Sequence, residues 1–388
     1  MATDRLYYED AYLTEFDAEA AEIRPGGWAA LNRSAFYPTS GGQPFDTGTL
    51  AVGERTLHVT DVEVEGGTVW HKVDGPLHAG DKVHGRIDWD RRFDHMQQHA
   101  ADHMLAGASW QMFGGVTIGL HLGKENSTID MTLPMGRTRL APEETEALET
   151  LVNQRIQQDG PIRCWFPAPQ ELEALPLRKR PTVAEHVRVV AMGDYEMVPC
   201  GGTHPRTTGQ IGPVKIISCT PARGKMRLCF VAGMRAVGLF RQAYGCAGSL
   251  AAALSADFDA APDALKRERD VSSSQRKDLQ ERLAQAALEI LREKKRGNIY
   301  AAHLPFADHA TLMRAASELT KDPEAVVLLS CPKEEGRLLV FARGASASPD
   351  MAQLLCSAGA RGGGKPDMAQ GSATETDALE KAMGMLES

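Results

Sequence analysis

Two short motifs, far apart in the chain, constrain its fold most strongly. The first contains His99 and His103, which are four residues apart in a stretch of helical character, so both imidazoles project from one helix face. The second contains Cys200 and His204 with the same spacing, but the glycine pair between them favours a turn. Three imidazoles and one thiolate form a good tetrahedral ligand set for Zn²⁺. A fold that forms this site must therefore place the Cys200 motif beside the histidine helix, although the two are far apart in the sequence.

The ligand types also limit the chemistry of such a site. Each motif taken alone is better explained by surface histidines and a buried cysteine, whereas the two together favour zinc over magnesium or calcium. Ala100 stands where the zinc peptidase motif HExxH has its glutamate, so the general base of that enzyme class is missing. Ester hydrolysis stays open, because a metal and a positioned water can suffice for a reactive ester. Four protein ligands are typical of structural zinc, whereas catalytic zinc keeps a position open, so both roles stay open too.

Composition excludes several classes of protein. The chain has 388 residues, enough for two to four domains, and a net charge of −8, so RNA contact must come from local patches rather than from a polybasic coat. Seven cysteines without framework spacing fit a reducing compartment. The N-terminus carries charges where a signal peptide needs an apolar core, and no apolar run approaches transmembrane length. We therefore expect a cytoplasmic protein that binds neither membrane nor DNA.

The first half of the chain predicts a β-rich domain followed by a mixed one. Residues 1–90 contain short alternating runs with glycine turns, including a hairpin signal about Gly66-Gly67, and these predict a small β-barrel. From Asp90 the period becomes helical, and a strand pair, a second helix from Pro142 and further short strands follow. Residues 91–235 lack βαβ regularity, so we predict an α+β domain. Arg91 and Arg92 are expected as solvated charges or as phosphate contacts.

The second half predicts a helical segment and a small α/β domain. Residues 236–297 are expected to form a helical linker, an amphipathic hairpin or short coiled coil. Its apolar stripe consists of Leu279, Leu283, Ala286 and Ile290 and is widened by Leu288 and Leu291. Residues 298–388 alternate strands and helices and contain a glycine-rich loop. That loop departs from a P-loop where Pro366 replaces the Ser or Thr that must reach magnesium, so we exclude an NTPase.

Four stretches, in this order, carry a resemblance to a known family: FYPTSGGQPFDTG (36–48), RRFDHMQQHAADHML (91–105), CGGTHPRTTGQIGPVKI (200–216) and GGGKPDMAQG (362–371). The chain resembles the editing domain of alanyl-tRNA synthetase and, more closely, the long form of the free-standing AlaX editing proteins. The resemblance implies a zinc-dependent hydrolase that deacylates mischarged tRNA-Ala, chiefly Ser-tRNA-Ala and, as a further candidate, Gly-tRNA-Ala. It also implies a DHHA1-type C-terminal domain for tRNA contact or self-association, with a homodimer through that domain or the helical linker as a candidate.

The resemblance also assigns site residues. His99, His103, Cys200 and His204 would hold zinc and form the catalytic centre, and the loop Ser40, Gly41, Gly42 and Gln43 would border the substrate pocket. A pocket that hydrogen-bonds the serine hydroxyl leaves polar groups unpaired with alanine and so spares the correct product. The candidate hydroxyls are Thr117, Ser127, Thr128 and Thr203, with Thr203 preferred. Two positions depart from the family, which usually has Ser or Thr at the position of Ala100 and Thr or Gln at the position of Asp102. The preference between serine and glycine as the amino acid removed therefore stays open.

Two other functions compete with editing. A non-catalytic tRNA-binding module with a structural zinc would bind Ser-tRNA tightly without turnover. A zinc hydrolase of another ester would act on small aminoacyl esters without binding tRNA, and its C-terminal domain would serve dimerisation.

Overall fold

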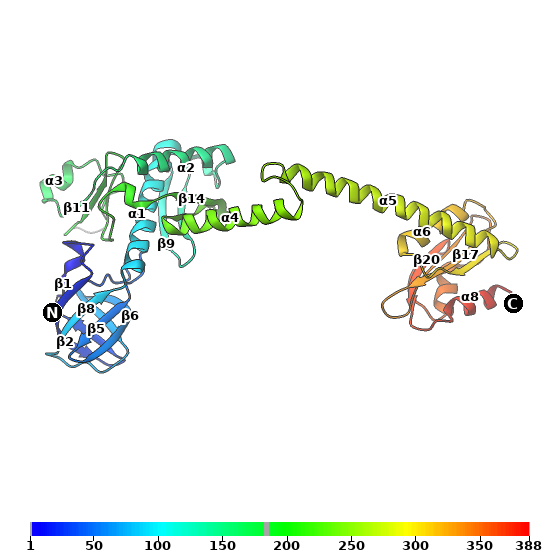
Figure 1. Ribbon diagram of the computed structural model, residues 1–388, viewed down its shortest axis with the longest axis horizontal. Helices are drawn as coiled ribbons and strands as arrows, with labels where there is room; N and C mark the ends of the chain where they lie inside the picture. Colours follow the sequence, from blue (N-terminus) through cyan, green and yellow to red (C-terminus); the bar gives the residue numbers. More distant parts are fainter. Residues whose placement is uncertain (1, 182–185, 388) are drawn as a thin grey trace. The chain divides into compact units, whose positions relative to one another are not determined.

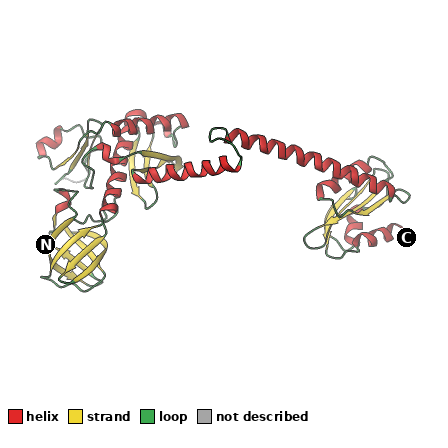
Figure 2. Ribbon diagram, in the orientation of Figure 1, coloured by secondary structure: helices red, strands yellow, loops and turns green. Residues whose placement is uncertain are grey.

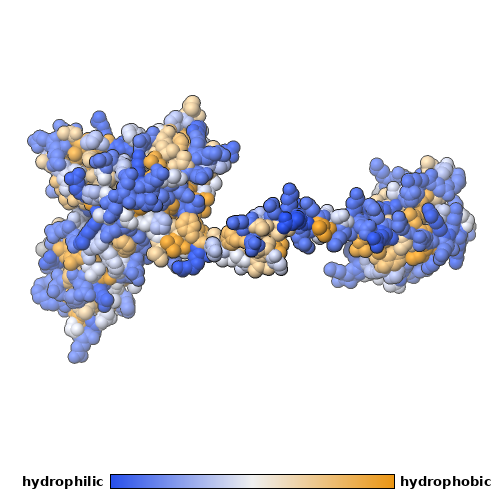
Figure 3. All heavy atoms as spheres, turned by 45° about the horizontal axis from the view of Figure 1, so that its top comes forward, coloured by the Kyte–Doolittle hydropathy of each residue, from blue (hydrophilic) through white to orange (hydrophobic). Residues whose placement is uncertain are grey.

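The computed structural model describes residues 2–181 and 186–387, and its chain divides into two compact units, Met1–Cys246 and Ala247–Ser388 (Figure 1). This division is coarser than the four predicted segments, whose boundaries stay a prediction. Within the described ranges, no helix combines the length and apolarity needed to cross a membrane. On the face drawn in Figure 3, hydrophilic residues cover most of the surface and hydrophobic residues form patches between them.

The predicted barrel is present at the start of the chain. Its strands close in the order β2-β3-β7-β6-β5-β8 around apolar side chains such as Phe16, Phe36 and Leu50. In β8 every second residue is buried, as a barrel wall requires. The predicted hairpin is confirmed, since β6 and β7 pair antiparallel across Gly66-Gly67. The strands are β2 (Glu15–Arg24), β3 (Trp28–Leu31), β5 (Gly48–Val52), β6 (Arg55–Glu65), β7 (Thr68–Val73) and β8 (Lys82–Ile87), with β1 (Asp4–Arg5) and β4 (Arg33–Ser34) paired beside them.

Helix α1 (Trp89–Phe113) leaves the barrel and carries the first predicted motif. It begins at Asp88, whose carboxylate accepts a hydrogen bond from the Arg91 amide, and ends at Gly114 in the left-handed conformation with φ 67°. Most of its length is buried, including histidines and glutamines as well as alanines. Buried polar groups are usually hydrogen-bonded, yet several on this helix, including both ring nitrogens of His103, have no partner among the described residues.

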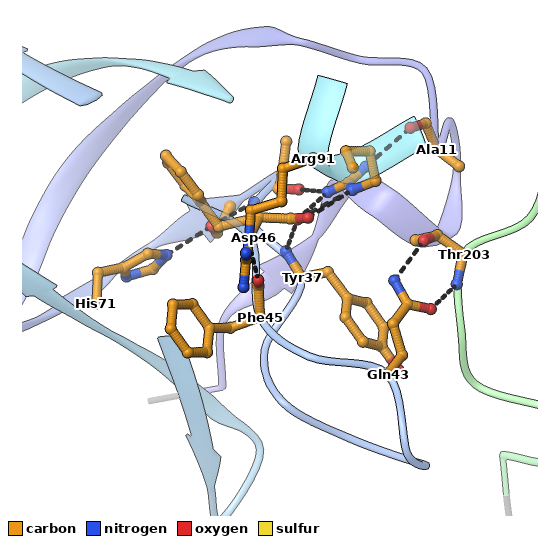
Figure 4. Close-up of polar contacts among 12 residues, drawn as sticks. Ala11, Tyr37, Gln43, Phe45, Asp46, His71, Arg91 and Thr203 are labelled. Carbon is orange, nitrogen blue, oxygen red and sulfur yellow. Dashed lines mark hydrogen bonds and ion pairs between the residues drawn. The ribbon is translucent and has the colours of Figure 1, made fainter. Parts of the chain in front are cut away.

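Arg92 corrects the expectation of a solvated or phosphate-binding charge. Its side chain is fully buried and pairs with the buried carboxylate of Asp46, with Nε to Oδ2 at 2.9 Å and Nη2 to Oδ2 at 2.5 Å. The guanidinium also donates to the carbonyls of Ala11 and Ala35, and Asp46 accepts from the Tyr37 amide (Figure 4). The pair therefore ties the first turn of α1 to the barrel.

A mixed layer follows, as predicted for an α+β region. An antiparallel sheet in the order β14-β15-β10-β9 packs against α1 and α2, and their apolar faces share one core. A smaller antiparallel sheet in the order β11-β12-β13 lies in the same unit. The elements are β9 (Val116–Leu122), β10 (Ser127–Thr132), α2 (Pro142–Gln157), β11 (Ile162–Trp165), α3 (Pro169–Ala174), β12 (Val189–Met192), β13 (Glu196–Pro199), β14 (Val214–Ala222) and β15 (Lys225–Ala232).

The helical segment is formed by α4 (Met234–Ala253) and α5 (Ala261–Glu293), and the predicted apolar stripe is confirmed only towards its C-terminal end, where Leu291 is buried and Leu288 and Ile290 are partly buried. Leu279 is 56% exposed, and the buried residues of α5 in this part of the helix are Ala284, Ala287 and Leu291. The last turns of α5 pack against α6 and β16, and Ala287 and Leu291 belong to that core. The buried face of α5 is therefore determined by packing against the C-terminal domain, and not by packing of two helices against each other.

The C-terminal sheet has the order β16-β17-β18-β20-β19 with helices on both faces (Figure 2). Strand β17 is buried along most of its length because alternate residues point into two cores, one shared with α5 and α6 and the other with α7 and α8. The elements are β16 (Ile299–His303), α6 (His309–Leu319), β17 (Val326–Pro332), β18 (Arg337–Arg343), α7 (Met351–Ser357), β19 (Arg361–Lys365), β20 (Met368–Ala373) and α8 (Ala378–Glu387).

The expected glycine-rich loop is instead the exposed edge strand β19. A Cβ on Gly362 would lie 2.2 Å from the Gln370 carbonyl oxygen, and one on Gly364 would lie 2.2 Å from that of Met368. Glycine therefore permits the close pairing with β20. The strand escaped prediction because glycines give no side-chain alternation to detect.

Candidate metal centre

The fold brings the two sequence motifs together. His99 and His103 lie one turn apart on α1, Cys200 follows β13, and His204 lies in the loop after it. Their ligand atoms all fall within 4.8 Å of one another. The Cys200 sulfur lies 3.5 Å from His99 Nε2 and 3.4 Å from His204 Nε2. The three histidines are buried and the cysteine is partly buried, so the cluster is nearly closed to solvent.

The electrostatics of this cluster suit a cation. Burial lowers the pKa of His99 to about 3 and lowers the pKa values of His103 and His204 well below their usual range, so all three imidazoles are neutral and free to act as ligands. Burial raises the pKa of the Cys200 thiol to about 12, and a bound cation would instead favour its thiolate. Neither ring nitrogen of His103 has a hydrogen-bond partner in the described part of the chain. A buried imidazole without partners fits a place in a metal's ligand set.

Gln43 orients the cluster from the barrel side. Its Oε1 lies 2.9 Å from His99 Nδ1 and 3.1 Å from the Thr203 amide nitrogen, which donates to it. Its Nε2 donates to the Thr203 hydroxyl at 2.8 Å (Figure 4). Because the carboxamide oxygen accepts, the proton of His99 lies on Nδ1 and Nε2 faces the other ligands. This is the arrangement by which outer residues fix metal-binding histidines.

Gly202 fits against the His99 ring with no space for a side chain. A Cβ at this position would lie 2.1 Å from His99 Cε1 and 2.4 Å from Nδ1. At Gly201 the nearest heavy atom, the Tyr8 hydroxyl oxygen, would be 3.4 Å away. The second glycine of the pair is thus required by the close approach of the loop to α1.

A cavity of about 290 Å³ opens beside the cluster. Three of the four candidate ligands line it: His99, His103 and Cys200. The other lining residues are Tyr37, Ser40, Gly41, Asp102, Thr117, Ile118, Gly119, Leu120, Arg178, Lys179, Val198, Pro199, Gly201 and Gly202. The cavity is therefore walled by α1, by the loop before β5, by β9, by the end of β13 with the loop after it, and by Arg178 and Lys179 from the segment between α3 and β12.

The predicted pocket residues fall into two groups. Ser40, Gly41 and Thr117 line the cavity, and the Thr117 hydroxyl has no partner among the described residues. Gly42, Gln43, Ser127, Thr128 and Thr203 are not among its lining residues. Gly42 packs against Leu120, and the fully buried Thr203 hydroxyl is already bonded to Gln43. Thr117 is consequently the best placed of the candidate hydroxyls.

Sequence reasoning missed the polar cavity side chains Tyr37, Arg178 and Lys179. It also missed the apolar ones, which are Ile118, Leu120, Val198 and Pro199. Arg178 Nε donates to both carboxylate oxygens of Glu196, at 2.7 and 2.9 Å, while the neighbouring Lys179 is exposed. The basic run that contains both residues was the available signal. Asp102 was noted as a departure from the family, and its side chain lies in the wall between the two histidines, where burial raises its pKa to about 7.

Comparison with known proteins defines the class. Residues 7–91 match the family described as tRNA synthetases class II (A), and residues 187–228 match the second additional domain of threonyl and alanyl tRNA synthetases. The second match includes Cys200 and His204. The chain is thus built from parts found in aminoacyl-tRNA synthetases. More particularly, it is an AlaX-like protein related to the editing domains of alanyl-tRNA synthetase.

Relatives align over nearly the whole chain. The alanine–tRNA ligase of Pyrococcus furiosus is 31% identical across 99% of this chain and 44% of its own length. That of Thermococcus kodakarensis is 31% identical across 95% of this chain and 41% of its own. The chain therefore spans less than half the length of these relatives. The C-Ala domain of Aquifex aeolicus alanyl-tRNA synthetase matches 23% of this chain and 86% of that domain at 19% identity and a TM-score of 0.22.

Proposed function

We propose that this protein hydrolyses the ester bond of mischarged tRNA-Ala, chiefly Ser-tRNA-Ala, with zinc held by His99, His103, Cys200 and His204. The observation that carries the proposal is the closeness of these ligand atoms, within 4.8 Å, at the wall of a cavity. Relation to alanyl-tRNA synthetase supports tRNA-Ala as the carrier of the ester. Since the relatives are ligases of more than twice this length, hydrolysis itself is the proposal's own step.

The chain's side chains have separate tasks in this function. Three neutral imidazoles and one thiolate would hold the metal, which when bound supplies a Lewis acid for the ester carbonyl. Gln43 fixes the orientation of His99. The apolar residues Ile118, Leu120 and Val198 limit the size of the amino acid admitted, while the Thr117 hydroxyl offers a partner to the hydroxyl of serine.

Deacylation assays with purified protein test the activity. Ser-, Gly- and Ala-tRNA-Ala are supplied with and without a chelator. We expect Ser-tRNA-Ala to be hydrolysed at least about a hundredfold faster than Ala-tRNA-Ala, since a site that hydrogen-bonds a hydroxyl disfavours the analogue that lacks it. Chelation should abolish turnover. A ratio near one would contradict serine editing.

Metal analysis of single variants tests the ligand set. The Cys200→Ala protein should lose most of its zinc, because a tetrahedral site loses its thiolate. Cys229→Ala, which removes a thiol from β15 outside the cluster, is the matched control and should keep full occupancy. Full zinc occupancy in Cys200→Ala would remove Cys200 from the set.

Two Thr→Val variants test the source of selectivity, since each deletes one hydroxyl and keeps the shape. Thr117→Val should lower the rate on Ser-tRNA-Ala and leave the slow rate on Ala-tRNA-Ala unchanged. Thr203→Val removes a hydroxyl bonded to Gln43 and should act through the orientation of the cluster, affecting both substrates alike. The reverse pattern would restore Thr203 as the discriminating hydroxyl.

A second function is favoured by one observation: four protein side chains converge, which is typical of structural zinc. In that case the protein binds tRNA without hydrolysing it. Tight binding of Ser-tRNA-Ala with no turnover by the zinc-loaded protein would select this function.

A further inference from the structure

Asp102 is an acidic side chain that has no role in the proposed editing chemistry. Its side chain is 94% buried, and its Oδ1 atom has no hydrogen-bond partner in residues 2–181 and 186–387. It lies on α1, three residues after His99 and one before His103, and lines the same cavity as both. A buried carboxylate without a partner is costly, so a position that keeps one is a candidate for receiving a ligand.

The charges around Asp102 leave it without a committed counter-ion. Burial raises the pKa of Asp102, and Arg178 is the main cation that opposes this effect, but its Nε donates to both carboxylate oxygens of Glu196. Lys179 also faces the cavity, yet its side chain is exposed and forms no ion pair within the described chain. The cavity therefore presents one buried carboxyl group next to the metal cluster, while the cations that line it are either paired or at the surface. A cationic ligand group bound beside this carboxyl would favour its ionised form against the effect of burial.

An α-aminoacyl ester offers the complementary charge at the matching place. Its ammonium group is attached to the carbon next to the ester carbonyl, so a residue that holds the ammonium must lie beside the residues that act on the carbonyl. Asp102 satisfies this requirement because it stands between the two histidine ligands along α1. A charge-assisted hydrogen bond in a buried site is among the stronger polar contacts.

We propose that the Asp102 carboxylate binds the α-ammonium group of the aminoacyl ester and makes the site selective for esters with a free amino group. This rests on the proposed hydrolysis of aminoacyl-tRNA. Asp102 touches the substrate at its amino group, whereas the Thr117 hydroxyl faces its side chain. The two contacts divide recognition into a part common to all aminoacyl esters and a part specific to serine.

The test compares Ser-tRNA-Ala with its N-acetylated form, which lacks the positive charge. The wild-type protein should prefer the free amine, and Asp102→Asn should lower kcat/KM for Ser-tRNA-Ala roughly ten- to a hundredfold while leaving the N-acetylated substrate unchanged. Asp130→Asn, which removes a partly exposed carboxylate paired with Arg227, is the control and should behave as wild type. Because the readout is a ratio of two substrates, it does not depend on the folded fraction of the variant.

Three results would overturn the assignment. In the first, the wild type shows no preference for the free amine. In the second, Asp102→Asn lowers the rates on Ser-tRNA-Ala and on its N-acetylated form equally. In the third, Asp102→Asn lowers the rate on Ser-tRNA-Ala but not the rate on Ala-tRNA-Ala, which would assign Asp102 to the serine hydroxyl. A binding measurement separates this inference from the proposed function. Calorimetry with an amide-linked seryl adenosine and its N-acetyl form should show the same preference in wild type and its loss in Asp102→Asn. Equal affinities in wild type would refute the role of Asp102 whether or not the protein hydrolyses tRNA.

Discussion

Replacing Asp46 by alanine should destabilise the N-terminal unit severely. Asp46 and Arg92 form a buried ion pair in which both side chains are fully inaccessible. In the variant the guanidinium keeps the carbonyls of Ala11 and Ala35 but loses its counter-charge, and the Tyr37 amide loses its acceptor. An uncompensated buried charge of this kind costs about 3–5 kcal/mol. We therefore expect the free energy of unfolding to fall by that amount.

The assay can be confined to one unit. All five tryptophans of the chain lie before residue 247, so tryptophan fluorescence during urea unfolding reports on the N-terminal unit. Glu65→Ala is the control, because its ion pair with Arg24 is exposed and should be worth less than about 1 kcal/mol. Adding Arg92→Met to Asp46→Ala should restore about 1–3 kcal/mol relative to the sum of the two single changes. The reasoning fails if Asp46→Ala costs no more than Glu65→Ala.

Three further predictions follow from other features. Gly202→Ala should displace the His99 ring and lower zinc content, whereas Gly201→Ala should not; equal zinc in both proteins would refute the steric argument. Burial lowers the pKa of His71 to about 4, below its unfolded value of 6.5, so its contribution to stability is full above pH 6.5 and is lost as the pH falls to 4. The unfolding free energy should accordingly drop by about 3 kcal/mol more over that range in wild type than in His71→Gln, as measured by urea titration at each pH. A protein ending at Gly233 should keep its zinc and some hydrolysis of Ser-tRNA-Ala at raised enzyme concentration but bind tRNA with a weaker salt dependence; a folded, zinc-loaded truncation without turnover would show that the later segments contribute to the chemistry.

The elements with a periodic side-chain pattern could be predicted from the sequence. The barrel strand β8 and the helix α2 each expose one face and bury another, and this alternation is visible without coordinates. The pairing of the histidine helix with the Cys200 loop was predictable because ligand chemistry restricts which residues must meet. Whether these four side chains hold zinc stays a prediction.

Features that depend on long-range partners could not be predicted. Nothing local marks Arg92 as buried, since its partner Asp46 lies in another segment and only the folded chain brings them together. The same holds for Gln43: the residue was expected near the pocket, but the contacts of its side-chain amide with His99 and Thr203 could not be predicted. The edge strand β19 was not predicted for a local reason, because its glycines have no side chains and so show no alternation of apolar and polar residues.

The contact of Gln43 with both His99 and Thr203 has a consequence for the order of folding. The site draws on the segment before β5, on the middle of α1 and on the loop after β13, so its closure requires long stretches of chain to be ordered first. A chain emerging from the ribosome without Cys200 and His204 offers only half of the ligands. We therefore expect metal to be captured late, after the barrel and the antiparallel sheet have formed. Because capture adds its binding energy to the last contacts made, bound metal would mark chains that have completed folding.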